Sequence, residues 1–345
     1  MDIIYVGITS GTSGARLRAL QDIGNNVKVF DYTKYFNSAT RFGRLLGYVL
    51  FSGAGIRRAN KDLIELAQRT HADVIWIDKA DWIYPMTLRI LRRDKNYLVH
   101  HVTDALFPSR VFLKVQRRYL LSNNRYFDTI FTTNRSDCAV LRSRFGDVAL
   151  HTRLGYDHRR FMPLSTDSSM RKYFESDVVF VGHHEPRTEL GIRALIQAGF
   201  RIRVYGVGWH KTETAKLLGD STGGAVDDTK YVHLLQTAKI ALGYISEWNY
   251  NETAGRSYEI PACGTFFLGY RTAEHLETYN QGTEAVFFQT EKELCDKVRL
   301  YLSEERLREK IAFAGWNRCV SSGYSYHDIM VRDWNIIASR LKATR

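Results

Sequence analysis

The feature that most constrains the fold is an alternation of short β-branched or aromatic runs with longer helical patterns. Strand-like runs occupy residues 3–9, 27–31, 73–78, 97–102, 128–133 and 148–152. Helical patterns separate these runs at residues 13–24, 38–69, 83–94, 109–123 and 135–145. Such alternation is typical of βαβ units, which place their strands in a parallel sheet.

The same pattern then restarts. Strand-like runs follow at residues 177–182, 201–206, 239–245, 265–269 and 285–288. Helical patterns follow at residues 186–198, 230–237, 254–262, 291–302, 304–318 and 325–342. The break at residues 155–175, where Pro163, Ser165, Ser168 and Ser169 gather, is interpreted as a linker. We expect an α/β protein with two Rossmann-like doubly wound domains, 1–160 and 161–322, facing across a cleft.

Composition excludes several other classes. A chain of 345 residues that is 44% hydrophobic, with only 5 prolines, is neither disordered nor collagenous. Its longest uncharged apolar stretch, residues 45–56, is shorter than the about 20 residues that span a bilayer. No basic segment or cleavage site opens the chain, so no signal peptide is expected. The 4 cysteines are far apart, which predicts reduced thiols in a cytoplasmic protein.

Positive charge is concentrated in the first half. The formal net charge is +12, of which residues 1–150 carry +10, from 23 Lys/Arg and 13 Asp/Glu. The clusters are Arg41/Arg44, Arg57/Arg58/Lys61, Arg89/Arg92/Arg93/Lys95 and Lys114/Arg117/Arg118. One interpretation is a solvated basic surface. The other is peripheral contact with anionic membrane at its inner face, where a lipid-linked or anionic acceptor is reached. No nucleic-acid-binding motif accompanies the charge, so nucleic acid is not an expected partner.

The turn after the first strand is rich in glycine. Residues 7–14 have the spacing G-x-x-x-G-x-x-G, which is neither a dinucleotide fingerprint nor a Walker A loop. Gly11, Thr12 and Gly14 are expected to let the backbone approach an acceptor, or simply to form a tight turn. No Asp-x-Asp pair occurs to hold a divalent ion against a diphosphate, so no metal is expected to be required.

The most informative segment is 244–264, where a strand ends and a polar loop enters a helix. Thr253 is the expected N-cap of that helix, whose free N–H groups would bind phosphate. Arg256 and Glu259, three residues apart, share a helical face. Arg256 can grip a diphosphate and Glu259 can accept both ribose hydroxyls. The alternative is an ordinary intrahelical ion pair.

Here the chain resembles a known family. Asn251-x-Thr253-x-x-Arg256-Ser257-Tyr258-Glu259-x-x-Ala262-Cys263-Gly264 resembles the C-terminal signature of CgeB-type (spore maturation protein-like) glycosyltransferases. Segments 177–187, 231–240 and 287–315 agree with it in order and spacing, so that the resemblance covers about residues 128–320.

The resemblance implies a GT-B fold, in which the C-terminal helix, residues 323–345, packs back on the first domain. It also implies a donor site for a nucleotide-diphosphate sugar, with UDP, GDP and dTDP left open. The expected donor-binding residues are Gly182, His183, Arg187, Tyr205, Gly206, Ser246, Asn251, Thr253, Arg256, Ser257 and Glu259. Related retaining families carry a glutamate at the position of Asn251.

The strand at residues 97–102 ends in two further candidates. His101 or Asp104 would act as general base toward an acceptor hydroxyl, or else they satisfy the backbone and cap a helix. The function expected is metal-independent transfer of a hexosyl group from the nucleotide sugar to an acceptor hydroxyl, in cell-surface polysaccharide or glycoconjugate biosynthesis. The alternatives are a nucleotide-sugar epimerase or hydrolase, and a non-catalytic module that binds anionic lipid or nucleic acid.

Overall fold

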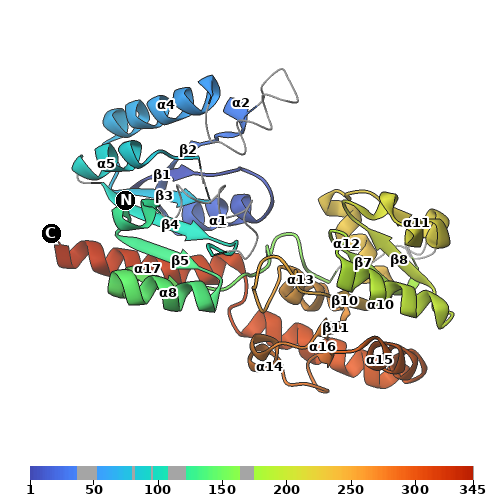
Figure 1. Cartoon of the computed structure of the whole chain (residues 1–345). Coiled ribbons are helices and arrows are strands. Elements are labelled where there is room, and N and C mark those ends of the chain that lie inside the picture. Colours follow the sequence, from blue (N-terminus) through green and yellow to red (C-terminus); the bar gives the residue numbers. More distant parts are fainter. Residues whose placement is uncertain (37–52, 80–81, 95, 108–121, 164–174, 345) are drawn as a thin grey trace. The chain divides into compact units, whose positions relative to one another are not determined.

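The computed structural model describes residues 1–36, 53–79, 82–94, 96–107, 122–163 and 175–344 (Figure 1). Several sequence expectations lie outside these residues, namely the basic clusters Arg41/Arg44 and Lys114/Arg117/Arg118, Lys95, most of the helix at 109–123 and the serines of the linker. The chain forms two compact units. Unit 1 comprises Met1–Arg153, Trp248–Asn251 and Tyr326–Arg345, and unit 2 comprises Leu154–Glu247 and Glu252–Ser325.

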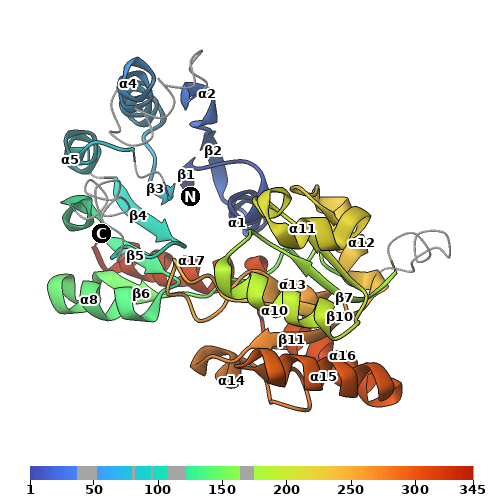
Figure 2. The same ribbon diagram turned by 45° about the vertical axis from the view of Figure 1, so that its right-hand side comes forward.

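Unit 1 is built on a parallel sheet of six strands in the order β2-β1-β3-β4-β5-β6. Its elements are β1 (Asp2–Val6), α1 (Gly11–Asp22), β2 (Asn26–Phe30), α2 (Thr33–Phe36), α4 (Ala54–Thr70), β3 (Val74–Asp78), α5 (Pro85–Arg93), β4 (Tyr97–Val102), the 3-10 turn η1 (Asn124–Tyr126), β5 (Thr129–Thr132), α8 (Arg135–Phe145), η2 (Gly146–Val148), β6 (Ala149–His151) and α17 (Tyr326–Thr344). The turned view in Figure 2 shows the strands side by side.

The two faces of this sheet are covered by different helices, because side chains of each strand alternate between the faces. One core joins apolar residues of the strands to α4 and α5, as at Leu63 and Leu88. The opposite core joins Tyr5, Trp76 and Phe131 to α1 and α17. The last helix of the chain therefore completes unit 1 by packing against α1.

Unit 2 also contains a parallel sheet of six strands, in the order β12-β11-β10-β7-β8-β9. Its elements are β7 (Ser176–Val181), α10 (Pro186–Gln197), β8 (Ile202–Tyr205), η3 (Trp209–Lys211), α11 (Glu213–Leu218), η4 (Gly219–Ser221), β9 (Thr222–Gly223), α12 (Asp228–Thr237), β10 (Ala238–Gly243), α13 (Arg256–Ala262), β11 (Phe266–Tyr270), α14 (Ala273–Thr278), β12 (Val286–Phe288), α15 (Glu291–Ser303) and α16 (Glu305–Ser321). α12 and α13 cover one face, and α10 and α15 cover the other.

The expectation of two doubly wound α/β domains is confirmed. The short elements α11, α14 and β9 were missed, since each has too few residues to show periodicity. The expectation that Thr253 caps a helix is wrong, because α13 begins at Arg256 and its N-cap is Gly255. In the described ranges, no helix has both the length and the apolar character needed to cross a membrane.

Each sheet has a point where the strand order reverses. In unit 1, β1 lies between β2 and β3, and in unit 2, β7 lies between β8 and β10. At this point the connections leave to opposite faces, and ligands of open α/β sheets bind outside the carboxyl ends of the strands there. The carboxyl ends of β1 and β3, and those of β7 and β10, are therefore where functional residues are sought.

Candidate functional site

Arg256 reaches the carboxyl ends of β7 and β10 from the start of α13. Its Nη1 donates a hydrogen bond of 2.7 Å to the carbonyl oxygen of Tyr244, and its guanidinium lies 5.2 Å from the ring centre of Phe180. A Cβ at Gly182 would lie 2.4 Å from Nη2, so only glycine leaves room for this arginine. No carboxylate pairs with Arg256 among the described residues. Its positive charge is therefore available to an anion.

Glu259, one turn further along α13, is a carboxylate with an open side. The Tyr231 hydroxyl donates to Oε2 over 2.8 Å, and nothing in the described part of the chain donates to Oε1. Burial raises the pKa of Glu259 above its ordinary value, although the Tyr231 hydrogen bond and the charge of Arg256 oppose this. Such a carboxylate gains from further hydrogen-bond donors, and a vicinal diol supplies two.

The loop that follows β7 is held rigidly. Trp209 Nε1 donates to the carbonyl oxygen of Gly182 over 2.9 Å, and the His184 backbone N–H donates to Val207 over 2.9 Å. Gly206 has φ of +142°, and a Cβ there would lie 1.9 Å from the oxygen of Gly182. The glycines at both positions therefore permit the close approach of two loops, which P-loop-like sites use to present backbone to phosphate.

Other expected donor residues lie around this edge with varied exposure. His183 is exposed, Ser246 is partly buried, and Tyr205 is buried with the Lys230 Nζ 4.6 Å from its ring centre. His184 is engaged by Glu189, with 2.7 Å between Nε2 and Oε2. Of the two adjacent histidines, His183 is thus the one whose ring is accessible.

Arg187 is partly neutralised. Its Nη2 lies 3.2 Å from the Glu247 carboxylate, and its guanidinium lies 4.6 Å from the ring centre of Tyr270. Glu247 in turn is fixed by its own N–H, which donates to Glu185 over 2.7 Å. An anion near Arg187 would have to compete with Glu247, so Arg187 is a weaker anion contact than Arg256.

Ser257 shapes the loop ahead of α13. It is fully buried, and its Oγ accepts from the Ala254 N–H over 3.0 Å and lies 2.7 Å from His275 Nε2. Burial lowers the pKa of His275 to about 4, and its Nδ1–H donates to the Tyr270 carbonyl over 2.7 Å, so Nε2 accepts from the serine. Thr253, two residues before the N-cap Gly255, is also buried. These contacts set the position from which Arg256 extends.

The glycine-rich segment of unit 1 consists of a tight turn and the first turn of α1. Gly11 and Thr12 are exposed, whereas a Cβ at Gly14 would lie 2.3 Å from the carbonyl oxygen of Thr9. The Tyr5 hydroxyl donates to the Ser13 carbonyl over 2.9 Å. Gly14 therefore permits this close approach at the start of α1, and Gly11 and Thr12 are the exposed residues of the same first helical turn.

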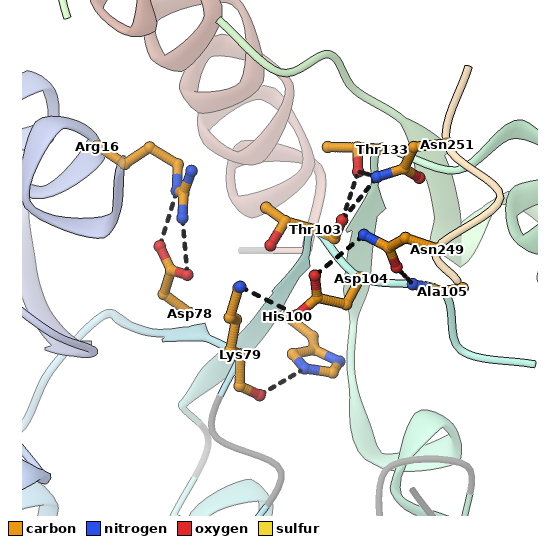
Figure 3. Close-up of polar contacts among 10 residues, drawn as sticks. All are labelled: Arg16, Asp78, Lys79, His100, Thr103, Asp104, Ala105, Thr133, Asn249 and Asn251. Carbon is orange, nitrogen blue, oxygen red and sulfur yellow. Dashed lines mark hydrogen bonds and ion pairs between the residues drawn. The ribbon is translucent and has the colours of Figure 1, made fainter. Parts of the chain in front are cut away.

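Below this loop lies a buried ion pair that sequence reasoning missed. Arg16 Nε and Nη2 donate to the two oxygens of Asp78 over 2.7 and 2.9 Å, with 0% and 1% of their side chains exposed (Figure 3). Burial alone raises the pKa of Asp78, but the charge and hydrogen bonds of Arg16 outweigh it and hold that pKa well below its ordinary value. No motif or spacing in the sequence links residues 16 and 78.

His101 and Asp104 differ in access to solvent. His101 is 1% exposed and lies between Trp76 and Phe131, with ring centres 6.2 and 6.4 Å away, and burial lowers its pKa to about 3. The Asp104 side chain is 41% exposed and its Oδ2 lies 3.0 Å from Lys79 Nζ. The carboxylate of Asp104 is therefore the accessible candidate base.

The segment Trp248–Asn251 belongs to unit 1, although its neighbours in sequence belong to unit 2. Asn249 Nδ2 donates to Asp104 Oδ1 over 3.2 Å, and Asn251 Nδ2 donates to the Thr103 carbonyl over 2.9 Å (Figure 3). Asn251, expected to bind donor, is thus buried against the end of β4. Lys79 and Asn249 were missed, although Lys79 follows β3 as Asp104 follows the adjacent β4.

Comparisons with known proteins agree with this architecture. Residues 187–332 match the family model described as glycosyl transferase-like. The structure of Anabaena Alr3699/HepE in complex with UDP and glucose is similar, with a TM-score of 0.69, 15% identity, and coverage of 98% of this chain and 100% of that chain.

Two further solved structures are similar over nearly the whole length. Sucrose-phosphate synthase from Thermosynechococcus elongatus gives a TM-score of 0.70 at 13% identity, covering 99% of this chain and 100% of that chain. A co-structure of S. aureus MnaA with UDP gives a TM-score of 0.61 at 13% identity, covering 99% of this chain and 97% of that chain. No curated protein sequence matches the chain. At these identities the likeness establishes the fold, which is that of the GT-B glycosyltransferases.

Proposed function

We propose that this protein is a metal-independent glycosyltransferase that moves a hexosyl group from a nucleotide-diphosphate sugar to an acceptor hydroxyl. The observation that carries the proposal is the pair Arg256 and Glu259 at the reversal point of the unit 2 sheet. There, an arginine without a carboxylate partner lies one helical turn from a carboxylate with an unfilled oxygen. A pyrophosphate and a ribose diol match these two groups in charge and hydrogen bonding.

In this proposal the donor's leaving group is stabilised by protein groups. As the bond from the sugar to the diphosphate breaks, its electron pair stays on the diphosphate oxygen, and Arg256 neutralises the developing charge. The glycine loop at Gly182 brings backbone close to the same anion. Glu259 accepts the ribose hydroxyls, which positions the nucleotide and contributes binding rather than chemistry.

Asp104 is the proposed base. Its carboxylate takes the proton from the acceptor hydroxyl while that oxygen forms a bond to the anomeric carbon, and the proton later leaves to solvent. The exposure of Asp104 and the burial of the His101 ring support the assignment of this role to the aspartate. Gly11 and Thr12 are the residues proposed to face the acceptor.

The comparisons support the donor class. The similar Anabaena protein was solved with UDP-glucose and the similar S. aureus protein with UDP, which makes UDP the first nucleotide to test. The CgeB-type assignment belongs to this proposal and is supported by the segment from Asn251 to Gly264.

Unit 1 is proposed to meet an anionic or lipid-linked acceptor. Arg89, Arg92 and Arg93 lie exposed on α5, and Met86 on the same helix is 60% exposed. Exposed arginines next to an apolar side chain favour contact with an anionic lipid surface. Binding to anionic vesicles that is lost at high salt supports this contact, and no binding at low salt contradicts it.

The decisive experiment is calorimetric titration of the protein with UDP, GDP and dTDP, followed by product analysis with the matching nucleotide sugar. Binding of one nucleotide, and its loss in Glu259→Ala but not in the control Glu213→Ala on α11, supports the proposal. Absence of nucleotide binding overturns it in favour of a non-catalytic module. An isomerised sugar, or rapid turnover without acceptor, points instead to an epimerase or hydrolase.

A further inference from the structure

Backbone strain marks the surroundings of Asp104. Three residues other than glycine have positive φ in the described chain, and His71 at 48° is accounted for as the C-cap of α4. The other two are Lys79 at 65° and Tyr250 at 48°. Lys79 contacts Asp104 directly, and Tyr250 follows Asn249, which also contacts Asp104. Such conformations cost about 1–3 kcal/mol each and persist where the surrounding structure requires them, often at functional sites.

Lys79 is fixed through its backbone by the neighbouring strand β4. Its N–H donates to the His101 carbonyl over 3.0 Å. Its own carbonyl accepts from His100 Nε2 over 3.1 Å, as Figure 3 shows. His100 is fully buried, and burial lowers its pKa to about 4, which keeps the ring neutral with one donor for that carbonyl. From this backbone the Lys79 Nζ reaches Asp104 Oδ2 at 3.0 Å.

Asn249 is fixed as firmly from the other side. Its Oδ1 accepts from the Ala105 N–H over 2.5 Å, and its carbonyl accepts from Asn134 Nδ2 over 3.2 Å. Its Nδ2 donates to Asp104 Oδ1 over 3.2 Å. The side-chain amide is thus bonded at its oxygen and at its nitrogen, which leaves it one orientation.

We propose that Lys79 and Asn249 are positioning residues that hold the Asp104 carboxylate in one orientation for proton transfer from the acceptor. Each contacts a different oxygen of Asp104. The 41% exposure of the carboxylate leaves it open to substrate. Fixing the base removes a rotational freedom that transfer would otherwise have to overcome. This inference rests on the proposed function.

A purely structural role for Asn249 makes a different prediction. If its purpose were only to anchor the segment 248–251 to the Ala105 N–H, an isosteric aspartate would serve as well, because a carboxylate oxygen also accepts that bond. If it positions Asp104, the same change replaces a donated hydrogen bond with a contact between two carboxylates. The variant Asn249→Asp therefore separates the two roles.

The experiment measures UDP release from UDP-glucose, with GDP-mannose and dTDP-glucose alongside, using water or an added membrane-lipid extract as acceptor. Asn249→Asp is compared with Asn26→Asp, since Asn26 Nδ2 also donates to an aspartate, Asp2, over 2.7 Å, but at the amino end of the sheet. We expect kcat to fall about 100-fold in Asn249→Asp, with nucleotide affinity unchanged, and to stay near wild type in Asn26→Asp. Lys79→Met lowers kcat similarly, and Lys79→Arg recovers part of it.

The outcomes separate this inference from the proposed function. A wild-type protein that neither binds nucleotide nor releases UDP overturns both. A wild-type protein that releases UDP, with Asn249→Asp and Asn249→Ala as active as Asn26→Asp, overturns the positioning role alone. If Asn249→Asp loses helical circular dichroism or nucleotide affinity in step with kcat, the residue is a structural anchor and the inference is likewise wrong.

Discussion

In both sheets, an arginine and a carboxylate lie near the point where the strand order reverses, but their charges are compensated in different ways. In unit 1, the arginine and the carboxylate below the loop are paired with each other, since Arg16 and Asp78 bond over 2.7 Å with almost no exposure. In unit 2, Arg256 bonds to a backbone carbonyl and Glu259 to a tyrosine, each over 2.7–2.8 Å. The charges at the first reversal point compensate each other, whereas those at the second keep charge and hydrogen-bonding capacity for a ligand.

The carboxylates show the difference most clearly. The pKa of Asp78 is held well below its ordinary value by Arg16, so its charge is already compensated. Burial raises the pKa of Glu259, so its charge is incompletely compensated in the free protein. Since a partly compensated charge gains most from new partners, the two reversal points differ in their capacity to bind an anionic ligand, although both lie where the strand order reverses.

The largest effect is expected on the free energy of unfolding when the buried Arg16–Asp78 ion pair is broken. Asp78→Asn leaves the Arg16 charge buried without a counter-charge, which is expected to lower the free energy of unfolding by about 3–5 kcal/mol. Urea unfolding followed by circular dichroism measures this. Glu65→Gln on α4, which removes exposed pairs of 3.6 and 3.8 Å, should change it by about 0–1 kcal/mol. Equal effects would contradict the view that the unit 1 pair is structural.

The next largest effect is expected on UDP affinity when the charge of Arg256 is removed. Arg256→Met keeps the length of the side chain but removes its charge, so UDP affinity is expected to fall about 10- to 100-fold, the range of one or two charge-assisted hydrogen bonds. Arg271→Met is the matched control, because Arg271 also lies in unit 2 but is paired with Glu293 over 2.9 Å. Calorimetry that finds the control as impaired as Arg256→Met would remove Arg256 from the site.

A smaller effect is expected at the glycine that makes room for Arg256. A methyl at residue 182 would meet Nη2 at 2.4 Å and the Phe180 ring at 2.7 Å, so Gly182→Ala displaces the guanidinium. UDP affinity should fall about tenfold. Gly224→Ala, where a Cβ would meet nothing within 4 Å, should bind as wild type does. Unimpaired binding by Gly182→Ala would mean that the arginine's placement does not matter.

The smallest effect is expected on how the free energy of unfolding changes with pH. With a raised pKa, Glu259 keeps its proton in the folded chain at pH values above 4.5, where the unfolded chain has released it. Its contribution to stability is therefore present below that value and lost as pH rises through the folded-state pKa. The free energy of unfolding of Glu259→Gln, relative to wild type, should increase with pH over this range.

The contribution of Asp78 to stability changes with pH in the opposite direction. Its contribution is present above its ordinary value of 3.8 and is lost as pH falls through the lowered folded-state pKa, so the destabilisation in Asp78→Asn should shrink in acid. Thermal melts at a series of pH values measure both trends. Trends of the same sign for the two carboxylates would show that their environments do not differ as described.

The sequence predicted the fold well because alternating β and α patterns repeat over many residues. It also predicted Arg256 and Glu259 near the carboxyl edge of unit 2, since both follow a strand closely in sequence. It could not predict the Arg16–Asp78 pair or the docking of Asn249 on the end of β4, because these contacts join residues 62 and 145 positions apart. It could not predict that Asn251 belongs to unit 1, since chain proximity does not show to which unit a four-residue segment belongs.

The most direct test of the central claim is a crystal structure of the protein in complex with UDP. The account predicts a diphosphate in contact with Arg256 and Gly182, and ribose hydroxyls donating to Glu259. A nucleotide bound instead at the glycine-rich loop of unit 1, with Arg256 and Glu259 left unoccupied, would contradict it.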